Sequence, residues 1–189
     1  MESIDYSELD ARLDELEERY LPVFHPTADY TDGQVDDMRA LRLLAHAEIE
    51  FFLERLCERL IVDLERNVDA KQSARGLEPR ERMILIWAKH AVQRSREAVN
   101  GNNGVKGKDI RAMFGPLGFD EGMFESISPV FLDKMNDFGK RRGDVAHQSS
   151  LRATWSITAQ GEKKKLDEIK EFMDKFHKLV QGHRLRALL

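Results

Sequence analysis

The segment from residue 35 to residue 68 most constrains how this chain can fold. It contains the run MRALRLLAHAEIEFFLERLCERL, in which an apolar residue recurs at every third or fourth position. The apolar positions are Leu41, Leu44, Ala45, Ile49, Phe52, Leu53, Leu56, Leu60 and Leu64. This period is that of one buried face of an α-helix. At 1.5 Å per residue the helix would be ~45 Å long. The pattern therefore predicts a central helix that several other helices cover.

Helical patterns account for most of the remaining chain. The expected helices are residues 7–20, 35–68, 79–99, 108–114, 128–139 and 162–186. Few stretches alternate with period two, so no sheet is expected. The run NGNNGVKG is predicted to be a flexible surface loop, and residues 154–158 a short extended connector. The fold class is therefore predicted to be an all-α helical bundle of four to five main helices.

A length of 189 residues suits a single domain. Residues 1–34 are expected to form an N-terminal helix and loop, and residues 35–188 the core bundle. Hydrophobic residues make up 41% of the chain, which is enough to build a core. The formal net charge of −4 excludes strong, sequence-independent binding of nucleic acid over the whole surface. Any contact with RNA or DNA must therefore be local.

The cysteine content and the N-terminus predict a cytoplasmic protein. The single cysteine, Cys57, excludes an intramolecular disulfide and falls within a helical pattern, where a buried core residue is expected. The first 20 residues are acidic and lack the apolar region of a signal peptide. No run of ~18 apolar residues is present, so no membrane span is expected.

The stretch FGKRRGDVAHQSS, residues 138–150, contains the candidate catalytic pair Arg142 and His147. Histidine titrates near neutral pH and can act as a general base or a general acid. Arginine stays charged and can bind two phosphate oxygens at once. This chemistry requires neither a metal ion nor a cofactor, and none is predicted.

The spacing of this pair poses a geometric problem. Residues five apart on an unbroken helix lie ~140° apart around its axis. A break in the helix at Gly143 would let both side chains face one cleft, and a twofold dimer would bring two copies of each together. In a third interpretation, Gly143 ends the helix and the basic residues are there because the helix dipole favours them.

A second cluster of polar residues lies on the long predicted helix. His46 and Glu50 are four residues apart on one face, with Glu48 nearby, so metal binding is geometrically conceivable. No second pair with ligand spacing accompanies them. A core histidine hydrogen-bonded to Glu50 is the favoured interpretation, and Glu50 could instead orient Arg142 across the bundle. Trp87 and Trp155 are interpreted as core or interface anchors.

Two separated segments resemble HEPN domains, which are all-helical domains found in many prokaryotic RNA-cutting toxins and defence proteins. RRGDVAH, residues 141–147, resembles their Arg-x4–6-His signature. LLAHAEIE, residues 43–50, is similar to a run in the long early helix of the RiboL-PSP-HEPN branch. The resemblance covers residues 35–185. It departs from the family after the motif arginine, where Gly143 replaces the usual Asn, Asp or His.

The resemblance implies a metal-independent endoribonuclease in a prokaryotic toxin or phage-defence setting. Arg142 and His147 would be catalytic, and Lys140, Arg141 and Asp144 would bind the RNA substrate. It also implies a homodimer with a composite site, and an antitoxin or another defence-system protein as a candidate partner. The alternative is a catalytically inactive HEPN-like module for dimerisation or interaction.

Overall fold

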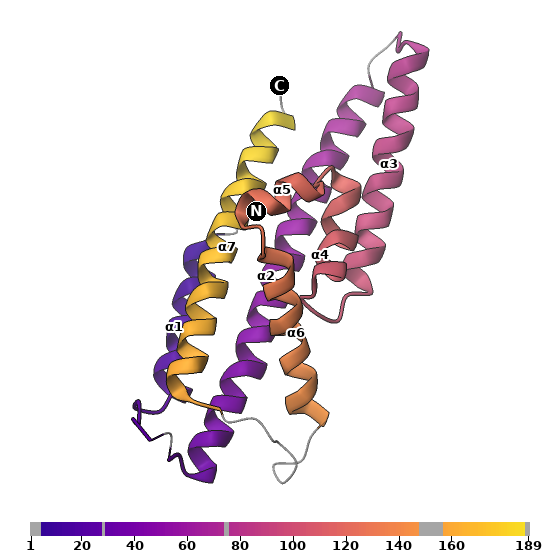
Figure 1. The fold of residues 1–189 in the computed structure, drawn as a ribbon. Helices are drawn as coiled ribbons and strands as arrows, with labels where there is room; N and C mark the ends of the chain where they lie inside the picture. Colours follow the sequence, from indigo (N-terminus) through magenta and orange to yellow (C-terminus); the bar gives the residue numbers. More distant parts are fainter. Residues whose placement is uncertain (1–4, 28, 74–75, 148–156, 188–189) are drawn as a thin grey trace.

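The computed structural model describes residues 5–27, 29–73, 76–147 and 157–187, in which every regular element is a helix (Figure 1). The elements are α1 (Tyr6–Tyr20), α2 (Asp32–Gln72), α3 (Pro79–Asn100), α4 (Gly107–Phe114), the 3₁₀ turn η1 (Gly115–Leu117), α5 (Glu121–Ile127), α6 (Phe131–His147) and α7 (Ala159–Ala187). The predicted all-α class is confirmed. Within these residues, no helix has both the length and the apolar character needed to cross a membrane.

Helix α2 is the centre of the fold, as its sequence pattern predicts. It contacts α1, α3, α4, α6 and α7, and it has buried residues from Met38 to Val68. The helix begins earlier than expected because Thr31 and Gln34 form a capping box at its N-terminus. Cys57 is fully buried, as predicted, and burial raises the pKa of its thiol to about 12.

Aromatic packing joins the second half of the chain to this central helix. The ring of Phe176 on α7 lies 4.8 Å from that of Phe114 on α4 and 5.9 Å from that of Phe131 on α6. Phe124, on α5, completes the cluster. All four side chains are buried in one core with the apolar face of α2. Burial of an aromatic side chain is among the largest single contributions to a core, so this cluster holds α4, α5, α6 and α7 together.

The structure differs from the expected helices in three places. Helix α1 begins at Tyr6, one residue earlier than expected, because the side chain of Asp5 caps it by accepting a hydrogen bond from the backbone N–H of Ser7. The seven-residue helix α5 was not expected, because it is too short to show a period. Helix α6 was expected to end near Gly139 but continues to His147. The predicted connector at residues 154–158 lies mostly outside the described residues, as does Trp155.

A buried ion pair ties α7 to α2. The guanidinium of Arg42 donates two hydrogen bonds to the carboxylate of Glu162, whose side chain is only 6% exposed. Lys165 donates a third to the same carboxylate, at 2.7 Å. Burial alone would raise the pKa of Glu162, but these three contacts outweigh it and hold the pKa below its ordinary value.

We expect Arg42→Ala to lower the free energy of unfolding by about 2–4 kcal/mol at pH 7, because it leaves a buried carboxylate with only Lys165. The loss should shrink at acid pH, once the pH falls through the lowered pKa of Glu162 and protonation removes its charge. Urea denaturation followed by circular dichroism measures both effects. The matched control is Arg111→Ala, which removes an exposed pair with Glu121 and should cost at most about 1 kcal/mol. Equal losses in the two variants would contradict the prediction.

Candidate functional site

Helix α6 runs without interruption through the whole motif. Gly143 lies inside the helix, so the predicted break does not occur, and the interpretation of Gly143 as a terminal cap is wrong. Arg142 and His147 are therefore ~140° apart around one continuous axis. Within one chain the two residues do not share a face of α6. A break at Gly143 is therefore not what brings the two residues together, and the twofold dimer stays a prediction.

The remaining motif residues all belong to α6. Lys140 is exposed to solvent. The backbones of Arg141, Asp144 and His147 are helical, while their side chains lie outside what the structure describes. Whether the imidazole and the guanidinium share a cleft is therefore a prediction that this structure does not test.

The described residues hold the guanidinium of Arg142 through its Nη1. Its Nη1 donates a hydrogen bond to the backbone carbonyl of Asn103 at 2.9 Å and lies 3.5 Å from Oε2 of Glu50. The side chain is 42% exposed. Among the described residues, no contact falls on Nε or Nη2. No described residue therefore occupies the side-on edge of the guanidinium, the edge whose geometry matches two phosphate oxygens.

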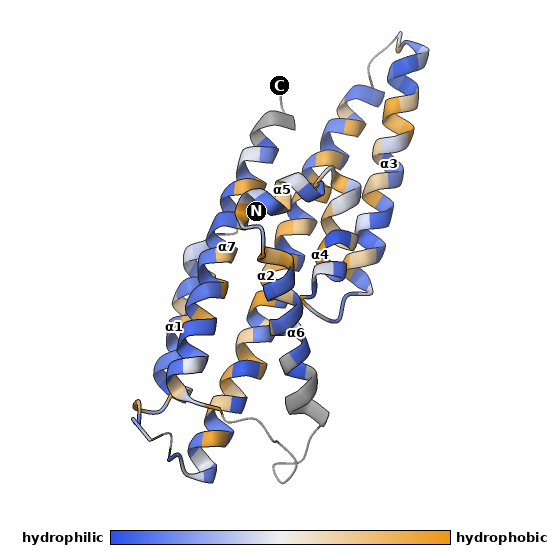
Figure 2. Cartoon of the chain, viewed as in Figure 1, coloured by the Kyte–Doolittle hydropathy of each residue, from blue (hydrophilic) through white to orange (hydrophobic). Residues whose placement is uncertain are grey.

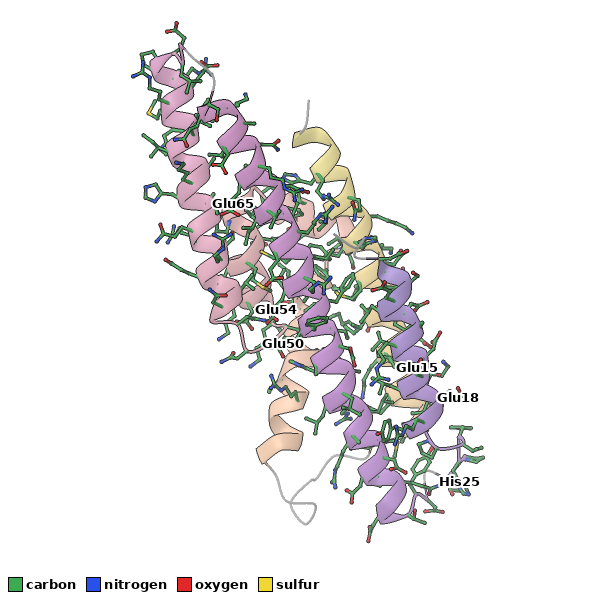
Figure 3. The ribbon with its side chains drawn as sticks, turned by 180° about the vertical axis from the view of Figure 1, so that it is seen from behind. Glu15, Glu18, His25, Glu50, Glu54 and Glu65 are labelled. Atoms are coloured by element: carbon green, nitrogen blue, oxygen red, sulfur yellow. The ribbon has the colours of Figure 1, made fainter. Side chains whose placement is uncertain are left out.

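Glu50 meets Arg142 from the central helix, as the sequence suggested. Its side chain is 16% exposed and lies one turn from Glu54 on α2 (Figure 3). Burial raises the pKa of Glu50, Arg142 opposes that shift, and Glu54 and Asp109 add to it. The charge of Arg142 is therefore what stabilises an ionised carboxylate at this position.

A neutral histidine lies beneath this pair. His46 is 1% exposed, and its ring stacks on Phe138 of α6 with the ring centroids 5.8 Å apart. Burial, followed by the charges of Arg142 and Lys106, lowers the pKa of His46 to about 4. Its Nδ1 lies 3.4 Å from Oε2 of Glu50 but makes no hydrogen bond, so the predicted bond is absent. Because the ring is neutral near pH 7, this contact is not an ion pair, and His46 serves as packing.

The loop between α3 and α4 supplies the other contact of Arg142. The sequence predicts a loop here, and the loop lies only partly at the surface, because Val105 is fully buried and Asn102 donates to Oε1 of Glu54 at 2.7 Å. Gly139 on α6 makes room for it, since a Cβ there would lie 2.8 Å from Cγ of Lys106. The loop is thereby fixed to both α2 and α6.

Sequence reasoning missed this loop as part of the site. The contribution of Asn103 is a backbone carbonyl, which leaves no trace in the residue type. The available signal was the glycine at position 139, one turn before the motif, which indicates a close approach by another segment.

The cluster can bind an anion more readily than a metal ion. Lys106, Lys140 and Arg142 bring positive charge to one region of an acidic chain. Among the described residues, no group of three or more His, Cys, Asp or Glu side chains is placed to hold a metal ion. Glu50 is already engaged by Arg142, and His46 is inaccessible to solvent.

The stability of the protein should depend on His46 between pH 7 and pH 4.5. A folded-state pKa of about 4, below the ordinary 6.5, means that the unfolded state takes up a proton first, so stability is lost as the pH falls through this range. We expect a loss of about 2 kcal/mol from this group. The variant His46→Leu should lose that much less than the wild type when urea denaturation is compared at the two pH values. Identical slopes, or an NMR titration of His46 near pH 6.5, would contradict the assignment.

Comparison with known proteins identifies the family. No curated protein and no solved structure gives a significant match. A family model, RiboL-PSP-HEPN, matches residues 7–182. The match begins within α1, well before the segment that the sequence resemblance covers, and it ends near the end of α7. Since it spans nearly all of the helical elements described above, the chain belongs to the RiboL-PSP-HEPN family.

Proposed function

We propose that this protein is a metal-independent endoribonuclease of the HEPN type. The observation that carries the proposal is the state of Arg142, whose guanidinium is anchored at Nη1 while its Nε and Nη2 edge is free of described contacts. A cation held in this way is preorganised for a phosphate group, and preorganised charge usually contributes more to catalysis than any other effect. Family membership points to the same RNA-related class of function.

The proposed reaction uses the nucleophile that RNA already contains. A base removes the proton of the 2′-hydroxyl, its oxygen attacks the adjacent phosphorus, and an acid protonates the departing 5′-oxygen. The products are a 2′,3′-cyclic phosphate and a free 5′-hydroxyl. His147 performs the proton transfers near neutral pH, and Arg142 stabilises the charge on the phosphorane. Lys140 and Arg141 bind neighbouring phosphates, and Asp144 supplies the polar group that Gly143 lacks.

A second subunit completes the site in this proposal. The continuity of α6 sets Arg142 and His147 of one chain on different faces. A twofold axis near the end of α6 would place Arg142 of one copy beside His147 of the other and bring both imidazoles into one groove. One His147 then serves as the base, and the other as the acid or as a positioning group. The proposed setting is a cytoplasmic toxin or phage-defence system.

An inactive interaction module is the second candidate, and one contact favours it. Arg142 ties α6 to the loop after α3 and to Glu50, which is a structural role that needs no chemistry. The same variants decide between the two functions, because a module would bind partners without cleaving RNA.

Purified protein is expected to cut single-stranded RNA in the presence of EDTA. Arg142→Ala and His147→Ala should each lower the rate by about 10²–10⁴-fold, since each removes charge stabilisation or proton transfer. Gel analysis of a labelled RNA, with chemical identification of the cyclic phosphate end, measures the effect. Lys175→Ala, an exposed cation on α7, should leave the rate unchanged. Equal cutting by wild type and His147→Ala would refute the assignment.

Complementation between two inactive variants tests whether the site is shared by two subunits. Mixing the Arg142→Ala and His147→Ala proteins allows mixed dimers to form, in which one groove keeps an intact arginine from one chain and an intact histidine from the other. Activity above that of either variant alone would support pairing between subunits. Because that groove retains only one of the two His147 side chains, the recovered rate should stay well below that of the wild type, and recovery to the full wild-type rate would contradict the role of the second imidazole.

Glu50 is proposed as a positioning residue for Arg142. The variant Glu50→Gln keeps the shape of the side chain but removes the charge that faces Nη1, so the guanidinium loses its fixed orientation. We expect kcat to fall about 10–100-fold with little change in KM. Glu48→Gln, on the same helix but paired with Arg12, is the control and should behave as wild type. Faster cleavage by Glu50→Gln would mean that Glu50 competes with phosphate and does not orient the arginine.

A further inference from the structure

Helix α3 exposes a row of apolar side chains to solvent. Met83, Ile86 and Trp87 are 48%, 56% and 65% exposed. Together with the basic residues before and after them they follow one face of the helix, here called the α3 stripe. The α3 stripe consists of Arg80, Met83, Ile86, Trp87, His90 and Arg94, all of them exposed. The buried side chains of α3, such as Leu85 and Val92, lie on the opposite face.

The composition of the α3 stripe indicates a protein interface. Trp87 is not a core residue, so one of the two interpretations offered by the sequence is wrong, and its role as an interface anchor stays open. Figure 2 shows hydrophobic residues along the first half of α3, where the helix lies at the edge of the molecule. A contiguous exposed patch that includes tryptophan and methionine is typical of binding surfaces.

Charge decides what kind of partner fits. Arg80 and Arg94 each lie seven residues from Trp87, so they stand at the two ends of the apolar centre. Among the described residues, neither has a carboxylate within 4.0 Å. Both cations therefore remain available to an anionic partner, and His90 lies on the same side of the helix.

Pairing between two copies of α3 is disfavoured by the same charges. An antiparallel pair centred on Trp87 would set Arg80 of one copy against Arg94 of the other. A parallel pair would set each arginine against its own counterpart. Like charges in contact oppose association, so a second copy is a poor occupant in either direction. RNA would meet the arginines but would leave Met83 and Ile86 in water.

The α3 stripe is also remote from the motif. The first half of α3 and the end of α6 lie at opposite ends of the molecule (Figure 1). A dimer joined near the end of α6 would leave both copies of the stripe uncovered. Binding there would therefore compete neither with dimerisation nor with substrate.

We propose that the α3 stripe is the docking surface for an acidic amphipathic helix of a different protein. The apolar face of that helix packs on Met83, Ile86 and Trp87. Carboxylates about four turns apart on the partner pair with Arg80 and Arg94, because 14 residues separate the two arginines. The inference does not depend on nuclease activity, since none of these residues belongs to the proposed site.

The test uses a displayed library of 21-residue amphipathic helices in which every polar position is either Glu or Lys. Selection on the full-length wild-type protein should enrich Glu at positions that flank the apolar face. The selected peptides should bind Trp87→Ser at least 10-fold more weakly, as measured by fluorescence anisotropy. Selection on the double variant Arg80→Glu/Arg94→Glu should enrich Lys in place of Glu. Phe51→Ser removes another exposed aromatic residue, on α2, and should bind like the wild type.

Three outcomes would overturn the proposal. The first is equal enrichment of Glu and Lys on the wild type, or binding that Trp87→Ser leaves unchanged. The second is a lower mass of Trp87→Ser in light scattering, which would assign the stripe to a second copy. The third is binding of oligouridylate that depends on Trp87, which would assign it to RNA. All substituted side chains are exposed, and circular dichroism verifies that each variant remains folded.

Discussion

The buried face of α2 is the constraint on which both the fold and the proposed site depend. Ile49 and Leu53 on this helix are fully buried in the core. His46 lies one turn before Ile49 in the sequence, and Glu50 lies between Ile49 and Leu53. Because residues three and four apart share a face of a helix, the packing that fixes the core residues also fixes the two that face α6. The position of Arg142 is thus a consequence of core packing.

The electrostatics of the site follow from this arrangement. A carboxylate that is largely buried at Glu50 is disfavoured by desolvation, and Arg142 offsets part of that cost. The neutral ring of His46 allows the arrangement, because a charged imidazole would compete with Arg142 for the same carboxylate. Glu50 and the backbone carbonyl of Asn103 therefore determine the orientation of Arg142. This arrangement stabilises one geometry of the guanidinium and, among the described residues, leaves Nε and Nη2 without a contact.

The sequence predicts the long elements well and the site only in part. Helices α2, α3 and α7 have enough turns for the hydrophobic period to be unmistakable, whereas α5 has only seven residues. The end of α6 was misjudged because Gly143 was treated as a break. A glycine inside a helix costs only about 1 kcal/mol relative to alanine, and the contacts of Arg142 with Asn103 and Glu50 can offset that cost. Whether a helix continues through a glycine thus depends on contacts with segments that are distant in the sequence.

The overall charge of the protein gives the proposed dimer a further physical role. With a formal net charge of −4, a single chain does not attract RNA over its general surface. The cations near the end of α6 must act locally, and the charge of Glu50 partly cancels one of them. Joining two chains at this end would double the local positive charge. Association would then create both the catalytic groups and the field that brings the substrate to them.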